Sequence, residues 1–393
     1  QYVLHTDRLI VKYKDADVGS AKARVATAMT AGRQAIADRA GQQLGLRLQA
    51  LRSTATGAHV FKIDRKVSVA EADALAKEMM ARDNSIEYAE PDRIMRKMAT
   101  ASDPMYTQQW HYYETTGGLR LPAAWDLSTG TGVKVAVIDT GIRPHADLAG
   151  QYVGGYDFIS DATIGNDGNG RDADPTDPGD WTAANECAAG DPASTSSWHG
   201  THVAGTIAAA TNNGVGVAGV AYGAKVVPVR VLGKCGGYTS DIADAIIWAS
   251  GGTVSGVPTN TNVAKVINMS LGGGGACGTT TQNAINSARS RGTVVIVAAG
   301  NENQNASNSN PANCAGVVAV AATNRNGARA PYSNYGTVVD VAAPGGDANG
   351  YILSTLNAGT SSPGADNYAG YQGTSMATPH VAGVAALMLA RNG

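Results

Sequence analysis

The chain has 393 residues, of which 43% are hydrophobic and 16% are charged, and 49 of them are glycine. This composition excludes a coiled coil and a largely disordered chain. The net charge of −2 gives no reason to expect nucleic acid or an anionic membrane as a partner. No apolar run approaches the roughly 20 residues of a membrane span. The first residues lack the basic and apolar regions of a secretion signal, so we expect that any signal has been removed.

The first 98 residues are expected to form a small α+β domain. The predicted strands are 2–13, 59–64 and 86–92, and the predicted helices are about 18–41 and 69–83. This part carries 17 Lys and Arg against 12 Asp and Glu, whereas the remainder carries 13 against 20. The opposite charges would attract the two parts, although ordinary scatter of charges explains the counts equally well. The polar, irregular residues 99–109 are expected to form a linker.

Residues 110–393 alternate long apolar runs with segments of helical spacing. The predicted strands are 133–139, 224–232, 265–271, 293–300 and 316–323, and the predicted helices are 199–212, 238–251, 279–291 and 374–391. Such a pattern is typical of strands buried on both faces. The predicted fold class is therefore α/β, a parallel β-sheet sandwiched by helices. Ligands of such sheets bind at the carboxyl ends of the strands, where Asp139 and Asn301 fall.

The four cysteines all lie in this second part, and none belongs to a C-x-x-C pair, which argues against a zinc site. Their flanking loop-forming residues favour disulfides. We favour the pairs Cys187–Cys235 and Cys277–Cys314, although three pairings are possible and the sequence leaves the other two open. Disulfides would place the protein outside the reducing cytosol.

Three short motifs contain residue types that chemistry could use together. Asp139 ends the predicted strand in VAVIDTGI, His199 begins HGTHVAGT, and Ser375 lies in GTSMATPHVAG. Each alone could be a turn, a helix cap or a core residue. A serine hydroxyl needs a base to become a nucleophile, and a carboxylate can orient a histidine for that task. The order Asp, His, Ser is that of the subtilisin fold.

On these motifs, the chain resembles the subtilisin-like serine proteases over nearly all of its length, and among them the secreted bacterial subtilases with extra disulfides. The resemblance implies a secreted, extracellular serine endopeptidase that hydrolyses peptide bonds of proteins through an acyl-enzyme. It implies that Ser375 is the nucleophile, that His199 moves the proton and that Asp139 orients His199. It also implies that the Asn301 side chain, which follows "VVIVAAG", stabilises the oxyanion.

The resemblance further implies two segments that pair with an extended peptide substrate on either side of the cleft. One contains Ser270, Leu271, Gly272 and Gly273, and the other contains Leu232, Gly233 and Gly236. Plain glycine-rich loops are the alternative interpretation.

Structural calcium is the implied cofactor. Its implied ligands are Asp147 and Asn213, joined by Asp167, Asp172 and Asp174 of an acidic loop, because Ca²⁺ takes six to eight oxygen ligands. A solvated acidic loop without metal is the alternative. The remaining histidines of the motif regions, His145, His202 and His380, are expected to be structural.

Residues 1–98 resemble the family's inhibitor-like prosegment, which implies a self-inhibited zymogen with its own prosegment as intramolecular inhibitor. We expect a processing site within Met98–Asp103, a monomer, and a catalytic domain that is truncated at its C-terminus, because the chain stops at Gly393 within a predicted helix. Two other classes stay open. One is a catalytically inactive relative that serves as a binding module. The other is an esterase-like hydrolase, although that would require G-x-S-x-G and the order Ser, Asp, His.

Overall fold

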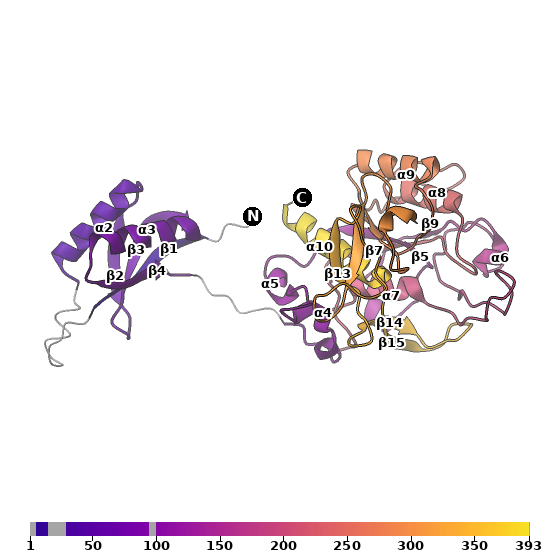
Figure 1. Cartoon of the computed structure of the whole chain (residues 1–393), viewed down its shortest axis with the longest axis horizontal. Coiled ribbons are helices and arrows are strands. Elements are labelled where there is room, and N and C mark those ends of the chain that lie inside the picture. The colour runs from indigo at the N-terminus through magenta and orange to yellow at the C-terminus, as the bar shows by residue number, and fades with distance from the viewer. Residues whose placement is uncertain (1–4, 15–28, 94–99, 393) are drawn as a thin grey trace. The chain divides into compact units, whose positions relative to one another are not determined.

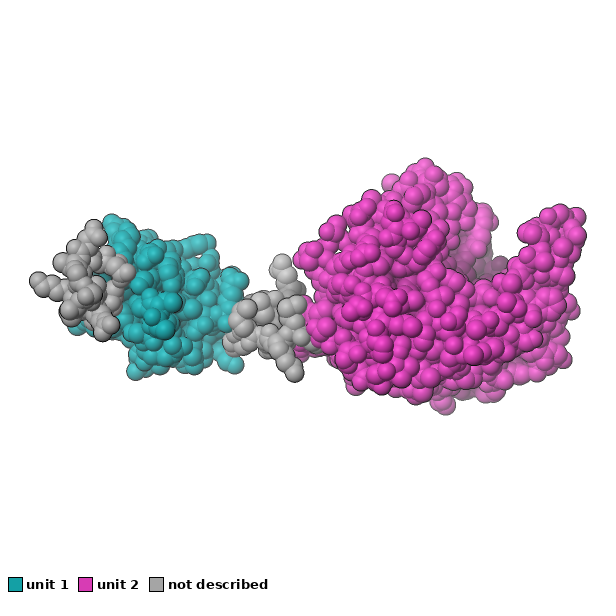
Figure 2. Space-filling model, turned by 90° about the horizontal axis from the view of Figure 1, so that it is seen from below, with its two compact units in different colours: residues 1–97 teal, residues 98–393 magenta. Residues whose placement is uncertain are grey.

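The computed structural model describes residues 5–14, 29–93 and 100–392. The chain divides into two compact units, Gln1–Lys97 and Met98–Gly393, which are teal and magenta in Figure 2. Across the described residues, no helix is long and apolar enough to cross a membrane.

The first unit is a four-stranded antiparallel sheet with two helices, in the strand order β2-β3-β1-β4. Its elements are β1 (His5–Tyr13), α2 (Ala31–Gln43), β2 (Leu48–Ser53), β3 (His59–Ser68), α3 (Val69–Arg82) and β4 (Ile86–Pro91). Helix α3 begins with a capping box, in which Ser68 and Glu71 satisfy each other's backbone N–H groups. The core between helices and sheet contains Leu9, Phe61 and Leu75. The α+β pattern is therefore as expected.

Two details of this unit differ from the sequence-based expectation. Strand β2 was not predicted, because its pattern of burial does not alternate regularly. The helix expected at about 18–41 is described only as α2, from Ala31 onward, and residues 15–28 lie outside the described part of the chain.

The described residues of the expected linker, 100–109, pack on the second unit instead of connecting freely. Ala101, Asp103 and Tyr106 are buried, and Asp103 accepts hydrogen bonds from the backbone N–H groups of Asn212 and Asn213, at 2.9 and 3.2 Å. The burial of Ala101 and Tyr106 and the hydrogen bonds of Asp103 depend on residues far away in the sequence, so a local sequence pattern could not indicate them. Residues 98 and 99 of the expected processing segment lie outside the described residues.

The second unit is built on a seven-stranded parallel sheet, in the order β13-β12-β10-β8-β5-β7-β6. Its strands are β5 (Lys134–Asp139), β6 (Tyr156–Asp157), β7 (Lys225–Arg230), β8 (Val266–Met269), β10 (Val294–Ala298), β12 (Val318–Thr323) and β13 (Val341–Pro344). The five predicted strands are all present in this sheet. The two edge strands, β6 and β13, were not predicted because they are short.

Helices cover both faces of the sheet, which confirms the predicted α/β sandwich (Figure 1). Val135 and Val137 of β5 face a core shared with α7 (His199–Ala208) and α10 (Thr374–Asn392). Ala136 and Ile138 face the opposite core, shared with α8 (Thr239–Ala249) and α9 (Thr279–Ser290). The alternation along one strand places α7 and α10, which carry His199 and Ser375, on the same side.

A hairpin of β14 (Ile352–Asn357) and β15 (Asp366–Tyr371) packs against α7. The approach is close: a Cβ atom added to Gly205 would lie 2.1 Å from Thr355 Oγ1. Glycine at this position therefore allows α7 to be buried beneath the hairpin.

The remaining elements are η1 (Tyr106–Gln108), α4 (Trp110–Tyr113), α5 (Leu121–Trp125), η2 (Ala146–Leu148), α6 (Ala162–Gly165), β9 (Gly273–Gly274), η3 (Ala306–Asn308) and β11 (Ser309–Asn310).

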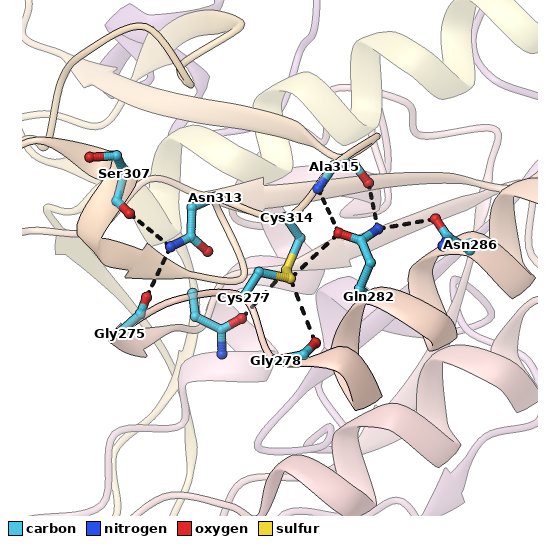
Figure 3. The surroundings of a disulfide bond; sticks show 10 residues. Gly275, Cys277, Gly278, Gln282, Asn286, Ser307, Asn313, Cys314 and Ala315 are labelled. Atoms are coloured by element: carbon cyan, nitrogen blue, oxygen red, sulfur yellow. Dashed lines mark hydrogen bonds between the residues drawn. A yellow bond between two sulfur atoms is a disulfide. The ribbon is translucent and has the colours of Figure 1, made fainter.

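Two disulfides, Cys187–Cys235 and Cys277–Cys314, close loops of the second unit, as the favoured pairing predicted. Figure 3 shows the second of these at the start of α9. Gln282 holds the same two segments together, because its side chain donates to the carbonyl of Ala315 at 2.9 Å and accepts from that residue's N–H at 2.8 Å. The disulfide and this amide therefore fasten the segment after β11 to α9.

Candidate active site

The predicted catalytic residues lie at the carboxyl edge of the parallel sheet. Asp139 is the last residue of β5, and His199 is the first residue of α7. Asn301 follows β10, and Ser375 is the second residue of α10. Parallel strands end at one edge, so residues that follow them meet there.

Asp139 and His199 form a direct hydrogen bond, with 2.7 Å between Asp139 Oδ1 and His199 Nδ1. Asp139 is fully buried, and the same oxygen accepts the backbone N–H of Thr140 at 2.8 Å. Because a carboxylate only accepts, Nδ1 carries the proton and Nε2 is left to act as a base. Burial lowers the pKa of His199, but the nearby Asp139, Asp180 and Asp177 carboxylates outweigh it, so the pKa is raised overall.

Thr140 connects the segments that carry Asp139 and His199. Its hydroxyl donates to Asp177 Oδ2 at 2.7 Å and accepts the N–H of Gly200 at 3.0 Å. Burial raises the pKa of Asp177 to about 6. A Cβ atom added to Gly200 would lie 2.2 Å from the carbonyl oxygen of Gly141, so only glycine fits where the two motifs meet.

Asp180 fixes the chain immediately before α7. Its two carboxylate oxygens accept hydrogen bonds from the backbone N–H and the hydroxyl of Ser197, at 2.6 and 2.7 Å. Trp198 then adopts a left-handed conformation with φ 50°, and its indole donates to the carbonyl of Gly359 at 2.7 Å. These contacts set the position at which His199 enters the helix.

Ser375 is held by Ser270, which lies 105 residues earlier in the sequence. The Ser375 hydroxyl donates to the Ser270 carbonyl at 3.2 Å, and the Ser270 hydroxyl donates to the Ser375 carbonyl at 2.8 Å. Asn268, at the end of β8, donates to the same Ser270 hydroxyl at 3.0 Å. The nucleophile candidate is thus tied to the strand that leads into the predicted substrate segment.

Asn301 is oriented by Thr374. Its Oδ1 accepts from the backbone N–H and the hydroxyl of Thr374, at 2.8 and 3.0 Å. This leaves the amide N–H groups of Nδ2 for another acceptor. A Cβ atom added to Gly373 would lie 3.6 Å from Ser375 N and 3.7 Å from Asn301 Nδ2. The two donors therefore both lie next to Gly373, and the role of Asn301 at an oxyanion stays a prediction.

Three hollows surround these residues and contain all seven predicted substrate residues. Ser375, Asn301 and Glu302 line a cavity of about 220 Å³ together with Ser270, Leu271, Gly272 and Gly273. His199, Asp180 and Ser270 line a second, of about 380 Å³, with Leu232, Gly233 and Gly236. A third, of about 500 Å³, lies between Leu232 and Gly236 on one side and Leu271, Gly272 and Gly273 on the other. The two predicted substrate segments therefore face each other across a groove.

The calcium candidates Asp147 and Asn213 do not present free oxygens to a cation. Asp147 is fully buried, and its oxygens accept from Asn213 Nδ2 and from the N–H of Val217, both at 2.8 Å. Asn213 Oδ1 accepts the N–H of Val215 at 2.9 Å. Burial raises the pKa of Asp147, and this effect outweighs the hydrogen bonds from Val217 and Asn213, which lower it. This pair does not fit the calcium prediction.

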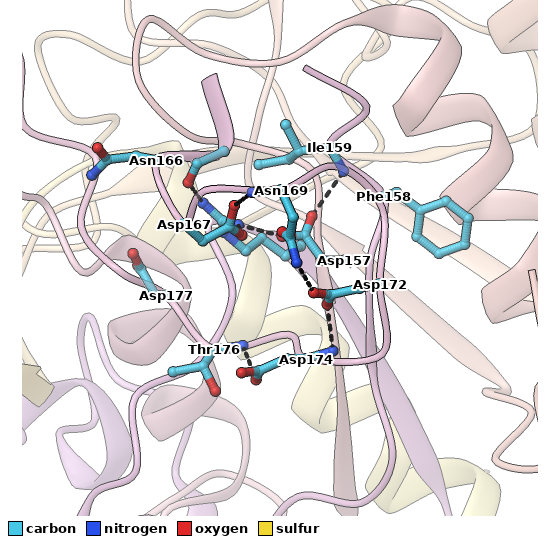
Figure 4. Close-up of polar contacts among 12 residues, drawn as sticks. Asp157, Phe158, Ile159, Asn166, Asp167, Asn169, Asp172, Asp174, Thr176 and Asp177 are labelled. Atoms are coloured by element: carbon cyan, nitrogen blue, oxygen red, sulfur yellow. Dashed lines mark hydrogen bonds and ion pairs between the residues drawn. The ribbon is translucent and has the colours of Figure 1, made fainter. Parts of the chain in front are cut away.

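The acidic loop brings the other three calcium candidates together (Figure 4), and their oxygens also accept hydrogen bonds, among them Asp172 from the backbone N–H of Asp174 at 2.7 Å and Asp174 from that of Thr176 at 3.0 Å. Asp167, Asp172 and Asp174 line a cavity of about 310 Å³ with Asn169 and Thr176. Asp167 pairs with Arg230 at 2.6 Å, and Asp172 accepts from Asn169 at 2.6 Å. Within the described part of the chain, however, no three His, Cys, Asp or Glu side chains form a group that could hold a metal ion.

The other histidines of the motif regions have partners of their own, as expected for structural residues. His202 bonds to the carbonyl of Ala369 at 3.0 Å, and His145 bonds to that of Asn367 at 3.0 Å. His380 forms a 2.7 Å hydrogen bond with His111.

Three residues of the site were not predicted: Thr140, Asp177 and Asp180. Thr140 directly follows Asp139, so its position in the motif was a usable signal. The two carboxylates gave no signal beyond their place in the acidic loop, because only the fold brings that loop to His199.

Comparison with known proteins identifies the family. The sequence profile of the subtilase family matches residues 130–393, which contain all four predicted catalytic residues. An extracellular protease of Xanthomonas campestris pv. campestris is 57% identical over 382 residues, covering 97% of this chain and 65% of that protein. An extracellular basic protease of Dichelobacter nodosus is 48% identical over 389 residues, covering 97% of this chain and 62% of that protein. The chain thus spans less than two thirds of the length of these relatives.

Solved structures agree with this result. A structure described as proteases from Pseudoalteromonas arctica PAMC 21717 superposes with a TM-score of 0.73 and 66% sequence identity, over 74% of this chain and 87% of that chain. The match in sequence and in fold leads to one conclusion: the chain belongs to the subtilase family.

Proposed function

We propose that the chain is an extracellular serine endopeptidase that cleaves proteins with Asp139, His199 and Ser375 through an acyl-enzyme. The observation that carries this proposal is the 2.7 Å hydrogen bond between the buried Asp139 and His199. The two extracellular relatives and the two disulfides agree with an extracellular location.

Each residue has a definite task in this reaction. The Ser375 hydroxyl turns from the Ser270 carbonyl to His199 Nε2, gives up its proton and attacks the scissile carbonyl carbon. The negative charge that forms on the carbonyl oxygen accepts hydrogen bonds from Ser375 N–H and Asn301 Nδ2. His199 then protonates the departing amine, which leaves an ester on Ser375. Water, deprotonated by His199, hydrolyses that ester, while Asp139 stabilises the imidazolium in both halves.

The substrate binds as an extended strand in the groove. Ser270, Leu271, Gly272 and Gly273 offer backbone groups on one side, and Leu232, Gly233 and Gly236 offer them on the other. Main-chain pairing of this kind accepts many sequences, so the side-chain cavities supply the selectivity.

The first unit acts as an intramolecular inhibitor, and the chain is a zymogen. Two observations support this: residues 1–97 form a separate compact unit, and this part of the chain is basic whereas the remainder is acidic. Cleavage within Met98–Asp103 would separate the two. N-terminal sequencing of active material should give a start in this range, and a start deep inside either unit would contradict the proposal.

A calcium ion would bind at the acidic loop with Asp172 and Asp174 as its two carboxylate ligands, and backbone carbonyls and water would have to supply the other oxygens, because no larger cluster of acidic side chains forms among the described residues. Carboxylate and amide oxygens are the ligands that Ca²⁺ prefers, and these residues line one hollow with Asn169 and Thr176. Chelation should lower the melting temperature, and Asp172→Asn with Asp174→Asn should remove that effect. An equal melting temperature with and without chelator would refute calcium binding.

A fluorophosphonate probe tests the catalytic assignment directly. It should label the wild-type protein at Ser375 and leave Ser375→Ala unlabelled. Hydrolysis of a peptide and of a matched ester then distinguishes an endopeptidase from an esterase. A protein that binds peptides but is neither labelled nor active would instead be a catalytically inactive relative.

A further inference from the structure

The cavity beside His199 contains a carboxylate, Asp180, that is not a member of the catalytic triad. Among the described residues that line it, Asp180 is the one with a carboxylate side chain. The others on its side are hydroxyl-bearing: Thr140, Thr182, Ser194 and Ser197. Asp180 accepts two hydrogen bonds from Ser197, and neither of these neutralises its charge.

Cations near the cavity are already committed elsewhere. Lys234 is adjacent in sequence to the disulfide half Cys235, but its ammonium pairs with Glu186 at 2.7 Å and lies 3.7 Å from the centre of the Trp181 ring. Within the described residues, no Lys or Arg forms an ion pair with Asp180. The carboxylate is therefore available to a cation that arrives with the substrate.

The register of an extended peptide identifies which side chain reaches Asp180. Ser375 must attack the carbonyl of the residue before the scissile bond, so that residue's side chain enters the cavity lined by Ser375 and Asn301. Successive side chains of a strand point to opposite sides. Ser270 borders both this cavity and the one that contains Asp180, so the two are neighbours. The second residue before the scissile bond therefore faces Asp180.

We propose that Asp180 makes the protein selective for a basic side chain, Lys or Arg, at the second residue before the cleaved bond. This inference rests on the proposed endopeptidase function. The cavity of about 380 Å³ has room for a long side chain, whose methylene groups can lie along Leu232 while its charged end meets the carboxylate.

Two peptides that differ in one group test the proposal. They share every residue, but one carries arginine and the other carries citrulline, its uncharged isostere, at the second position before the cleaved bond. We expect kcat/KM to be roughly fivefold higher for the arginine peptide, the size of one partly shielded ion pair. A ratio of two substrates cancels any change in His199 that a variant introduces.

Asp180→Asn is the informative variant. Its Oδ1 can still accept the Ser197 N–H, and its Nδ2 can donate to the Ser197 hydroxyl, so both contacts survive with one reversed. Asp191→Asn is the matched control, because it removes the same charge from an exposed residue of the same segment that does not line the cavity. We expect the first variant to lose the preference and the second to keep it.

The outcomes distinguish a failure of this inference from a failure of the proposed endopeptidase function. If the wild-type protein is labelled by fluorophosphonate and cleaves both peptides equally well, the inference is wrong and the proposed function stands. If it is neither labelled nor active, the proposed function fails. If Asp180→Asn does not fold, ionic strength decides with the wild type alone: the preference should shrink as salt rises, and a salt-independent preference would overturn the proposal.

Discussion

Replacing Arg230 by methionine should destabilise the second unit by about 3–5 kcal/mol, because it strands a buried charge. Arg230 ends β7, in register with Asp139 of β5, and its side chain is 1% exposed. The guanidinium pairs with Asp157, also 1% exposed, with Asp167 at 2.6 Å, and with the carbonyl of Gly165. Asp167 is 23% exposed and can be hydrated. Asp157 cannot be hydrated, and burial raises its pKa to about 7 even beside Arg230, so above pH 7 the loss comes mostly from keeping this carboxylate ionised without its partner.

Urea unfolding followed by tryptophan fluorescence measures this effect, because all five tryptophans lie after residue 98 and report on the second unit alone. A Ser375→Ala background prevents self-digestion. Adding Asp157→Asn to Arg230→Met should recover roughly half of the loss, since it removes the stranded charge. The control is Arg325→Met, which breaks an exposed pair with Glu114 and should change stability far less than Arg230→Met does. Equal losses for Arg230→Met and this control would refute the reasoning.

Three further expectations concern the site and its support. Asp139→Asn should lower kcat by about 10⁴-fold with little change in fold, because His199 would no longer be held with its proton on Nδ1; steady-state kinetics measures this. The acid limb of the kcat/KM profile should lie above the ordinary histidine pKa of 6.5, since carboxylates raise the pKa of His199 and the base must be neutral; a limb below 6.5 would contradict this. Replacing both Cys277 and Cys314 by serine reopens a loop of 37-residue separation and should lower the free energy of unfolding by up to about 4 kcal/mol, measured by urea titration against the parent.

Apolar periodicity was sufficient to predict the centre of the fold. The central strands of the second unit are buried on both faces, so each appears in the sequence as a continuous apolar run between helices. Helices α7, α8, α9 and α10 were likewise predicted, from segments with helical spacing of apolar residues between those runs. The short and exposed strands were not predicted: β6 has two residues, and every residue of β15 is exposed or half-buried, so neither has a pattern that distinguishes it from a loop.

The site divides in the same way between local and distant information. Asp139, His199 and Ser375 each lie in a recognisable motif, because the close packing around them demands particular small neighbours. The Ser270–Ser375 hydrogen bonds join residues that are 105 positions apart, and no local signal reveals them. Asp180 likewise reaches His199 only because the fold brings the acidic loop to the cleft.

The ionisation of Asp177 lowers the stability of the folded protein but supports the proposed role of His199. Its pKa is raised from 3.8 to about 6 by burial, so the folded protein binds a proton that the unfolded chain has already lost between those values. The free energy of unfolding therefore falls as pH rises from about 4 to about 6, and above pH 6 the ionised carboxylate costs about 3 kcal/mol. An uncharged residue would avoid that cost. In the proposed reaction, the ionised form would help to stabilise the imidazolium of His199, and it would do so only above the pH at which Asp177 ionises. Below that pH, His199 is protonated and cannot act as a base. Folding stability therefore favours the neutral form of Asp177, whereas the proposed reaction favours its ionised form. This arrangement favours activity at neutral to alkaline pH.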